Sequence, residues 1–184
     1  MRATDNRLGI IGAECSGKST LADSLSGLLH GVVAGEVLRE FVDREGRPPQ
    51  AAEQADIMRD QRDREDQARR AHPGWVVIGD PAPLMTAVYS LAYFDDDTLV
   101  DEAVRLCADY DLVVWCDIDI PWVPDGLQHD GPDARRRVHE IIDVIVENHL
   151  IPHGVPVISA SGGLDSRLGA VARAWQQRGL SAPT

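Results

Sequence analysis

One short segment contains residue types that bind phosphate, in the spacing that the chemistry requires. Residues 12–19 read Gly-Ala-Glu-Cys-Ser-Gly-Lys-Ser and match the pattern G-x-x-x-x-G-K-[ST] at every fixed position. The glycines let the backbone N–H groups point inward at phosphate oxygens, while Lys18 would reach the β- and γ-phosphates and the Ser19 hydroxyl would bind Mg²⁺. The segment therefore predicts a site for ATP or GTP with Mg²⁺. The expected phosphate-binding residues are Gly12, Glu14, Cys15, Ser16, Gly17, Lys18, Ser19 and Thr20.

The lysine of this segment is unusual within the chain. Of the 18 basic residues, 17 are Arg and Lys18 is the single Lys. A flexible ammonium group can enter a tight phosphate-binding loop, whereas a planar guanidinium is a poor replacement there. The only Lys thus stands where phosphate binding needs one, and we expect it to be catalytic.

Two carboxylates follow apolar segments that are expected to be strands. Glu36 comes soon after residues 32–34, and Asp80 comes soon after residues 75–78. Either could accept a proton from an acceptor hydroxyl, and Asp80 stands where P-loop proteins place a carboxylate near Mg²⁺. The structural alternatives are a helix N-terminus for Glu36 and a turn cap for Asp80. We expect Ser19 and Asp80 to hold the metal, and the choice of general base between Glu36 and Asp80 stays open.

The segment after the fourth expected strand has side chains suited to an organic ligand. Trp122, between two prolines, could stack on a flat ring, with added attraction for a cationic one, and Asp119 and Asp125 could bind ribose hydroxyls. The alternative for Trp122 is a core residue that anchors the loop. We expect Trp122 and Asp125 to contact the substrate, together with Glu36 and Arg39.

Three adjacent arginines, residues 135–137, stand out in an acidic chain. On a helix, at most one or two of them can face the same phosphate. We expect a lid over about residues 120–137 that donates one arginine, with Arg136 as the candidate, to the transferring phosphoryl group. The alternative is that these arginines are solvated surface residues.

The chain alternates short apolar segments with longer amphipathic ones, which predicts an α/β fold with a parallel sheet covered on both faces. Such sheets bind ligands beyond the carboxyl ends of their strands. The charge-dense helix over 49–71 is expected to be largely solvated. We find no domain boundary and expect one nucleotide-binding domain over residues 1–184. Strands are expected at 8–11, 32–34, 75–78, 112–116 and 155–158, and helices at 18–30, 36–45, 49–71, 83–93, 98–108, 132–150 and 164–178.

Composition narrows the class of partner. The net charge of −12 disfavours nucleic-acid binding through the general surface. No apolar run has the length of a membrane span, and the N-terminus lacks the apolar stretch of a signal peptide. The three cysteines have no metal-site spacing, which favours reduced thiols. We therefore expect a cytoplasmic protein with a small-molecule substrate, no nucleic-acid or membrane partner, and an oligomeric state that the sequence leaves open, a homodimer included.

Several motifs, taken in order, resemble one family. They are the segment 12–21, Glu36-x-x-Arg39-Glu40-Phe41-Val42, Gln61 in the long helix, Asp80, and Asp119-Ile-Pro-Trp122-x-x-Asp125-Gly-Leu127. This set is similar to the ribosylnicotinamide kinase domain of bacterial NadR-type proteins, over about residues 8 to 178. The Pro-Trp-x-x-Asp-Gly-Leu segment is its most specific part.

The resemblance implies a P-loop kinase fold with a parallel sheet of order 2-3-1-4-5. It implies ATP- and Mg²⁺-dependent phosphorylation of the 5′-hydroxyl of nicotinamide riboside, with Trp122 at the nicotinamide ring and Asp125 at the ribose. The chain has no counterpart of the adenylyltransferase and DNA-binding domains that often accompany this domain, so we expect neither activity. Pro81 and Gln128 depart from the family's Thr and Arg, which keeps open a kinase for another nucleoside or small alcohol. A regulatory nucleotide-binding ATPase without a phosphoryl acceptor is the alternative of a different class.

Overall fold

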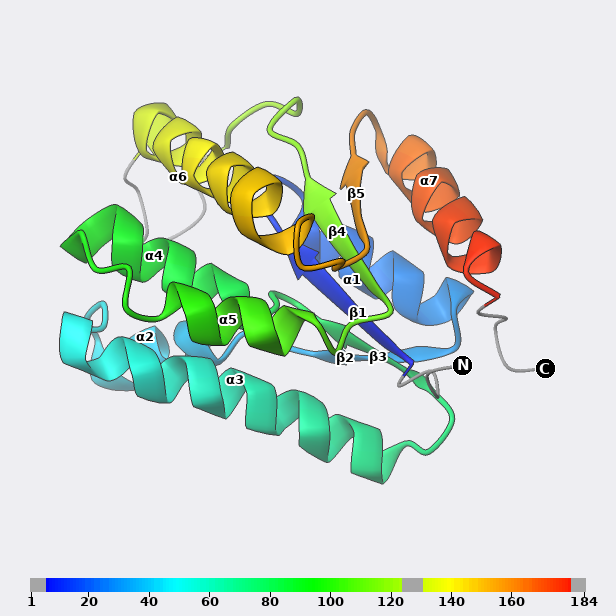
Figure 1. Ribbon diagram of the computed structural model, residues 1–184, viewed down its shortest axis with the longest axis horizontal. Coiled ribbons are helices and arrows are strands. Elements are labelled where there is room, and N and C mark those ends of the chain that lie inside the picture. The colour runs from blue at the N-terminus through cyan, green and yellow to red at the C-terminus, as the bar shows by residue number, and fades with distance from the viewer. Residues whose placement is uncertain (1–5, 124–130, 180–184) are drawn as a thin grey trace.

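The centre of the molecule is a five-stranded parallel sheet (Figure 1). The computed structural model describes residues 6–123 and 131–179. All four pairs of neighbouring strands run parallel, in the order β2-β3-β1-β4-β5. This confirms the predicted fold class and strand order. The strands are β1 (Arg7–Ile11), β2 (Gly31–Ala34), β3 (Val76–Gly79), β4 (Leu112–Cys116) and β5 (Val157–Ala160).

Helices cover both faces of this sheet (Figure 1). On one face lie α1 (Lys18–Leu28) and α7 (Leu164–Gln177), which contact each other. The other face is covered by α3 (Ala51–Ala71), α4 (Leu84–Phe94), α5 (Val100–Cys107) and α6 (Gly131–Ile145), with α2 (Val37–Glu45) packed on α3. The π-helical turn η1 (Val146–Leu150) continues α6. No helix in the described part of the chain is long and apolar enough to cross a membrane.

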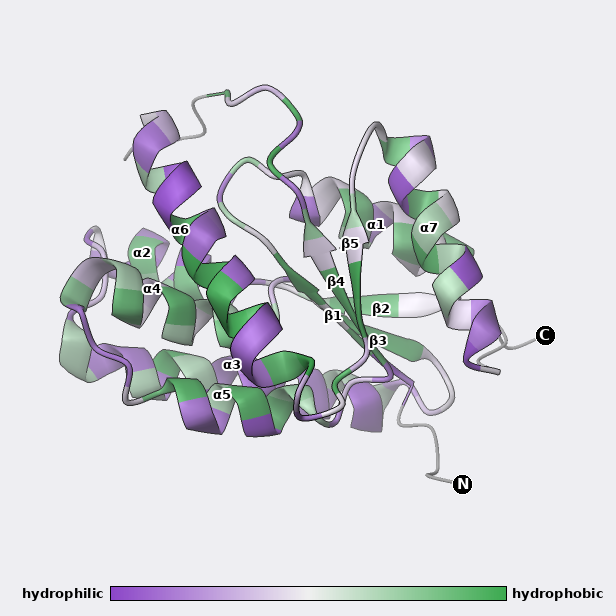
Figure 2. Ribbon diagram, turned by 45° about the horizontal axis from the view of Figure 1, so that its top comes forward, coloured by the Kyte–Doolittle hydropathy of each residue, from purple (hydrophilic) through white to green (hydrophobic). Residues whose placement is uncertain are grey.

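Two apolar layers hold the helices on the sheet, because side chains alternate between the faces of a strand. Leu8 and Ile10 of β1 belong to the layer under α1 and α7, which also contains the buried side chains of Leu25 and Trp175. Ile11 belongs to the layer on the other side, which contains most of α4. Figure 2 shows hydrophobic residues along most of the sheet and on parts of the helices that cover it.

The expectation of a largely solvated helix over residues 49–71 is wrong for one face of α3. That face is buried and consists of Gln54, Ile57, Met58, Gln61 and Glu65. Three of these five residues are polar, so the apolar periodicity that marks a packed helix is nearly absent from the sequence. Two of the polar members, Gln61 and Glu65, are buried with hydrogen-bond partners from other elements.

A smaller difference has a local cause. Strand β5 begins at Val157, two residues later than predicted. Pro156 lacks an N–H group and cannot donate to the sheet, although its carbonyl accepts a 2.7 Å hydrogen bond from the Val113 N–H.

The strand order indicates where on the sheet a ligand would bind. Strand β1 lies between β3 and β4, and the chain returns to β1's other side only after it has formed β2 and β3. The turns after β1 and β4 therefore lead away in different directions at the carboxyl end, which is where open parallel sheets bind ligands. The phosphate loop, Glu36, Asp80 and Asp119 all follow this end of a strand.

Candidate nucleotide and acceptor site

The loop between β1 and α1 requires its two fixed glycines. Gly12 has φ +155, and a Cβ there would lie 2.7 Å from the Ser16 Oγ and 3.0 Å from the Cys116 carbonyl oxygen. Gly17 has φ +81 and is the N-cap of α1, a left-handed conformation that favours glycine. Because α1 begins at Lys18, the loop ends at a helix N-terminus, whose free N–H groups and dipole favour an anion.

Side chains of the loop fold onto its own backbone. The Ser16 hydroxyl, which is fully buried, donates a 2.7 Å hydrogen bond to the Ala13 carbonyl. The Lys18 ammonium group donates to the same carbonyl at 2.8 Å. Ser19 and Thr20 are exposed in the first turn of α1. The loop is therefore closed internally, with its ammonium group and two hydroxyls at the helix N-terminus.

Asp80 lies one residue beyond β3 and is only 7% exposed. Burial raises the pKa of its carboxyl group, while a hydrogen bond from Ser19 and the charge of Lys18 act in the opposite direction. Its Oδ1 is buried and has no hydrogen-bond partner among the described residues. An unpaired buried carboxylate oxygen beside a serine hydroxyl suits a hard divalent cation such as Mg²⁺.

The described residues contain no cluster of three or more His, Cys, Asp or Glu side chains placed to hold a metal. This does not conflict with a magnesium site at Ser19 and Asp80. Mg²⁺ in phosphoryl-transfer proteins is bound by one or two protein groups plus substrate phosphates and water, rather than by an all-protein cage.

Glu36 lies on the neighbouring strand end, as the N-cap of α2. Burial raises the pKa of this carboxyl group, the charges of Lys18 and Arg39 lower it, and the charge of Asp80 raises it. The Arg39 Nε lies 3.8 Å from the Glu36 Oε2. The structure thus brings two partly desolvated carboxylates and Lys18 within electrostatic reach of one another.

Gln61 of α3 fixes the turn that carries Glu36. Its Oε1 accepts a 2.9 Å hydrogen bond from the Val37 N–H, and its Nε2 donates to the Gly35 carbonyl at 3.2 Å. Gln61 is only 3% exposed. The buried amide therefore holds the residues on both sides of Glu36 against α3.

Tyr89 of α4 was not singled out from the sequence. Its hydroxyl is within electrostatic reach of Glu36, Glu14 and Asp80, and burial together with these carboxylates raises its pKa well above the ordinary value. The phenol is therefore neutral and lies within electrostatic reach of Glu36. No sequence signal marked it, because an apolar helix accommodates a tyrosine without any functional role.

The segment after β4 is described as far as Val123. Trp122 is half-buried, and the carbonyl of the next residue, Val123, accepts a 3.1 Å hydrogen bond from the Cys15 thiol of the phosphate loop. Asp125 and Gln128 lie outside the described residues. The structure thus places the start of the expected lid against the phosphate loop.

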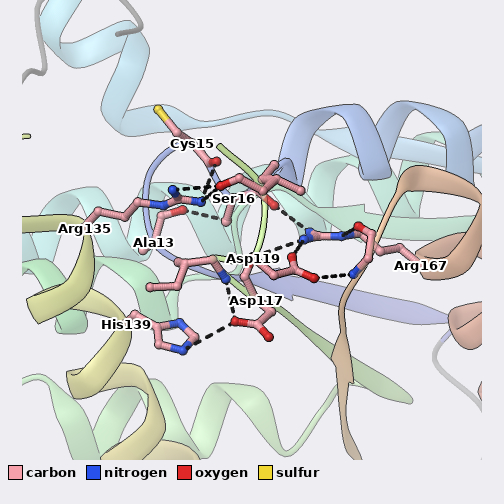
Figure 3. A network of polar contacts seen from close by, with 11 residues as sticks. Ala13, Cys15, Ser16, Asp117, Asp119, Arg135, His139 and Arg167 are labelled. Atoms are coloured by element: carbon pink, nitrogen blue, oxygen red, sulfur yellow. Dashed lines mark hydrogen bonds and ion pairs between the residues drawn. The ribbon is translucent and has the colours of Figure 1, made fainter. Parts of the chain in front are cut away.

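The lid arginines differ in their surroundings. The Arg136 side chain is 62% exposed and pairs with Asp133 at 3.2 Å. Arg135 is 5% exposed, and its guanidinium donates to the Cys15 and Ile120 carbonyls (Figure 3). Of the two, Arg136 has the more accessible side chain.

A second buried arginine was missed by sequence reasoning. Arg167 of α7 donates to the Ser16 carbonyl at 2.6 Å and to the Asp119 Oδ1 at 2.5 Å (Figure 3). The other carboxylate oxygen of Asp119, expected at a ribose hydroxyl, accepts from the Gly162 N–H. Arg167 is 151 residues from Ser16 in the chain, so no local pattern could have linked them.

The strand order, the glycine loop and the helix that follows it define a P-loop nucleotide-binding protein. The chain belongs to the AAA domain family, whose model matches residues 7–167. No curated protein matches it in sequence.

Solved structures with this fold include several kinases. NadR protein in complex with NR superposes with a TM-score of 0.71 at 20% identity, over 97% of this chain and 53% of that one. Thymidylate kinase from Candida albicans gives 0.69 at 13% identity, over 95% and 92%. Deoxyadenosine kinase from M. mycoides gives 0.64 at 11% identity, over 93% and 99%. The chain spans about half the length of the NadR protein.

Proposed function

We propose that this protein is a kinase that transfers the γ-phosphoryl group of ATP to a hydroxyl of a nucleoside-like small molecule, with nicotinamide riboside as the acceptor. The observation that carries the proposal is the pair of partly desolvated carboxylates, Glu36 and Asp80, near Lys18. A nucleotide switch needs one carboxylate for its metal. A second, desolvated carboxylate at the end of β2 has a use when a hydroxyl must be oriented and deprotonated.

The two carboxylates have separable roles. The Ser19 side chain lowers the pKa of Asp80, which supports assigning Asp80 to the magnesium side of the site. Glu36 instead faces Arg39 and lies within reach of the Tyr89 hydroxyl, which assigns it to the acceptor side as the general base. Mg²⁺ bound at Ser19 and Asp80 would offset the negative charge of the phosphates.

The remaining residues position the reactants. The N–H groups of the phosphate loop and the α1 N-terminus bind the phosphates, and the Lys18 ammonium exchanges the Ala13 carbonyl for a phosphate oxygen. The exposed Arg136 is the lid arginine that can turn toward the transferring group, because the Arg135 guanidinium is held by backbone carbonyls. These donors stabilise charge that develops on the phosphoryl oxygens.

Two features support nicotinamide riboside. The printed description of one structural neighbour is NadR in complex with NR, and this chain carries the Pro-Trp-x-x-Asp-Gly-Leu segment of that family. A cationic pyridinium ring suits a site with Glu36, Asp80 and Glu14 near Tyr89, and Trp122 could stack on it.

A second acceptor class is favoured by a different observation. Thymidylate kinase from Candida albicans and deoxyadenosine kinase from M. mycoides share the fold with this chain as well, at TM-scores of 0.69 and 0.64. A kinase for another nucleoside would keep the roles of Lys18, Glu36 and Asp80 and would differ in the acceptor pocket.

Acceptor-dependent ADP release with Mg-ATP tests the proposal. The panel consists of nicotinamide riboside, common ribo- and deoxyribonucleosides, and thiamine, with mass spectrometry of the product. Strong stimulation by nicotinamide riboside, lost in Lys18→Ala and much reduced in Trp122→Ala, is the expected result. Turnover of another panel member alone would reassign the acceptor. Slow hydrolysis that no acceptor stimulates would contradict the kinase proposal and favour a regulatory ATPase.

A further inference from the structure

Two buried arginines approach the phosphate loop from opposite sides (Figure 3). One is Arg135 in the second turn of α6, and the other is Arg167 in the first turn of α7. Arg135 is 5% exposed and Arg167 is 3% exposed. Arginine is rarely buried to this extent without a specific partner. Both donate to carbonyl oxygens of consecutive loop residues, Cys15 and Ser16.

Arg135 links the loop to the segment after β4. Its Nη2 donates to the Cys15 carbonyl at 3.1 Å and to the Ile120 carbonyl at 3.0 Å, and its Nη1 donates to Ile120 at 3.1 Å. Cys15 has φ +52, an uncommon conformation for a residue with a side chain. The guanidinium therefore holds the loop at the residue whose backbone conformation most needs support.

Arg167 links the loop to the turn after β5. Its Nη1 donates to the Ser16 carbonyl at 2.6 Å and its Nε to the Gly162 carbonyl at 2.9 Å. Its Nη2 donates to the Asp119 carboxylate at 2.5 Å and to the Asp117 carbonyl at 3.1 Å. Every nitrogen of this guanidinium is used within the protein.

These contacts act on the groups that bind phosphate. The Cys15 carbonyl and the Ser16 N–H belong to one peptide unit, as do the Ser16 carbonyl and the Gly17 N–H. A cation on the carbonyl oxygen polarises the unit and strengthens its N–H as a donor. It also adds positive charge behind a loop that must bind a polyanion, in partly buried surroundings where charge is weakly screened.

We infer that Arg135 and Arg167 are positioning residues of the nucleotide site, which hold and polarise the phosphate loop through its carbonyls without touching phosphate. This differs from the role of a lid arginine, which must reach the transferring phosphoryl group. The inference rests on the proposed nucleotide site and not on the identity of the acceptor. It predicts that these residues control affinity for the triphosphate group.

The test compares ligands with and without phosphates on Arg135→Gln. Dissociation constants for Mg-ATP, inorganic tripolyphosphate and adenosine are measured by displacement of a fluorescent ATP analogue. Losing one charge and its two-carbonyl contact should weaken Mg-ATP and tripolyphosphate about tenfold, with adenosine unchanged. Arg135→Lys keeps the charge but reaches fewer carbonyls, so its affinity for tripolyphosphate should lie between Gln and Arg.

Arg167 is tested in the same assay with a milder change. Arg167→Lys keeps the charge but cannot reach the Ser16 carbonyl, the Gly162 carbonyl and the Asp119 carboxylate together, so it should also weaken tripolyphosphate binding. Arg173→Gln is the matched control, since Arg173 is an exposed arginine on the same helix, and its affinities should equal those of the wild type. Melting temperature and circular dichroism of each free protein report folding.

Several results would overturn the inference. Unchanged tripolyphosphate affinity, equal losses for adenosine and tripolyphosphate, or a Lys variant no better than Gln would each do so. If Arg135→Gln does not fold, Arg135→Lys alone must still weaken tripolyphosphate more than adenosine. A wild type that binds neither Mg-ATP nor tripolyphosphate would overturn both proposals. Reduced triphosphate affinity in a protein that phosphorylates no acceptor would support this inference and refute the kinase proposal.

Discussion

Gln61 offers a sharp test of how Glu36, the proposed general base, is positioned. Gln61→Ala leaves the Val37 N–H without its 2.9 Å partner in a buried environment and removes the donor to the Gly35 carbonyl. An unpaired buried backbone N–H costs about 1–3 kcal/mol. We expect the free energy of unfolding to fall by about 2 kcal/mol, measured by urea denaturation with an unchanged m-value.

The same change should lower turnover selectively. Gly35 and Val37 flank Glu36, so releasing them lets the carboxylate drift, and a displacement of about 1 Å can cost about 100-fold in rate. We expect kcat with the acceptor to fall by about 10- to 100-fold. The KM for ATP should change little, because Gln61 has no hydrogen bond with the phosphate loop among those in the described part of the chain.

The control for this prediction is Gln67→Ala, an exposed glutamine on the same helix, which should leave both stability and turnover unchanged. The reasoning is refuted if Gln61→Ala loses less than about 0.5 kcal/mol, the range of neutral surface substitutions. It is also refuted if the KM for ATP rises as much as kcat falls.

Three further predictions concern carboxylates of the protein. Glu36→Gln should lower kcat by about 10²–10⁴-fold while ATP still binds. Burial raises the pKa of Glu36 above its ordinary 4.5, so the wild-type rate in a pH–rate profile should fall as the pH drops through that pKa. The same pH–rate profile in the Glu36→Gln variant would contradict the general-base role. Asp80→Asn should raise the Mg²⁺ concentration for half-maximal activity by about 10- to 100-fold, and equal Mg²⁺ titrations of variant and wild type would contradict a metal role. Burial raises the pKa of Glu65 from 4.5 to about 7, so the folded protein binds a proton that the unfolded chain has released, and stability should fall as the pH rises from about 4.5 to about 7. Glu65→Gln, which can still accept the 2.7 Å hydrogen bond from Tyr110, should reduce this slope in denaturation experiments across that range, and a slope as steep as that of the wild type would contradict the assignment.

How well each part of the site could be predicted depends on how far apart in the sequence its interacting residues lie. The phosphate loop could be read from eight consecutive residues, because its function depends on local backbone geometry at Gly12 and Gly17. The carboxylates Glu36 and Asp80 could be found because each follows an apolar strand, and parallel strands bring their carboxyl ends to one edge. The separate roles that we propose for them could not, because the proposal depends on which carboxylate lies near Ser19.

The burial of certain polar residues could not be predicted from the sequence for a different reason. Arg7, Gln61 and Glu65 look like ordinary charged or polar residues, and their burial is set by partners far away in the chain, 58 residues in the case of Arg7 and Glu65. A polar residue gives no periodic signal when its partner, not its own chemistry, makes burial tolerable.

The sequence by itself determined the fold class and the phosphate loop, because these depend on apolar periodicity and on one local motif. The strand order was predicted only through the family resemblance. Only the tertiary structure decided which arginines donate hydrogen bonds to the carbonyls of the phosphate loop. Arg135, Arg136 and Arg137 are adjacent in sequence, yet α6 buries the first against the Cys15 carbonyl and leaves the second exposed. Which arginine is buried depends on how α6 is rotated about its axis when it packs. Three identical neighbouring residues do not reveal that rotation.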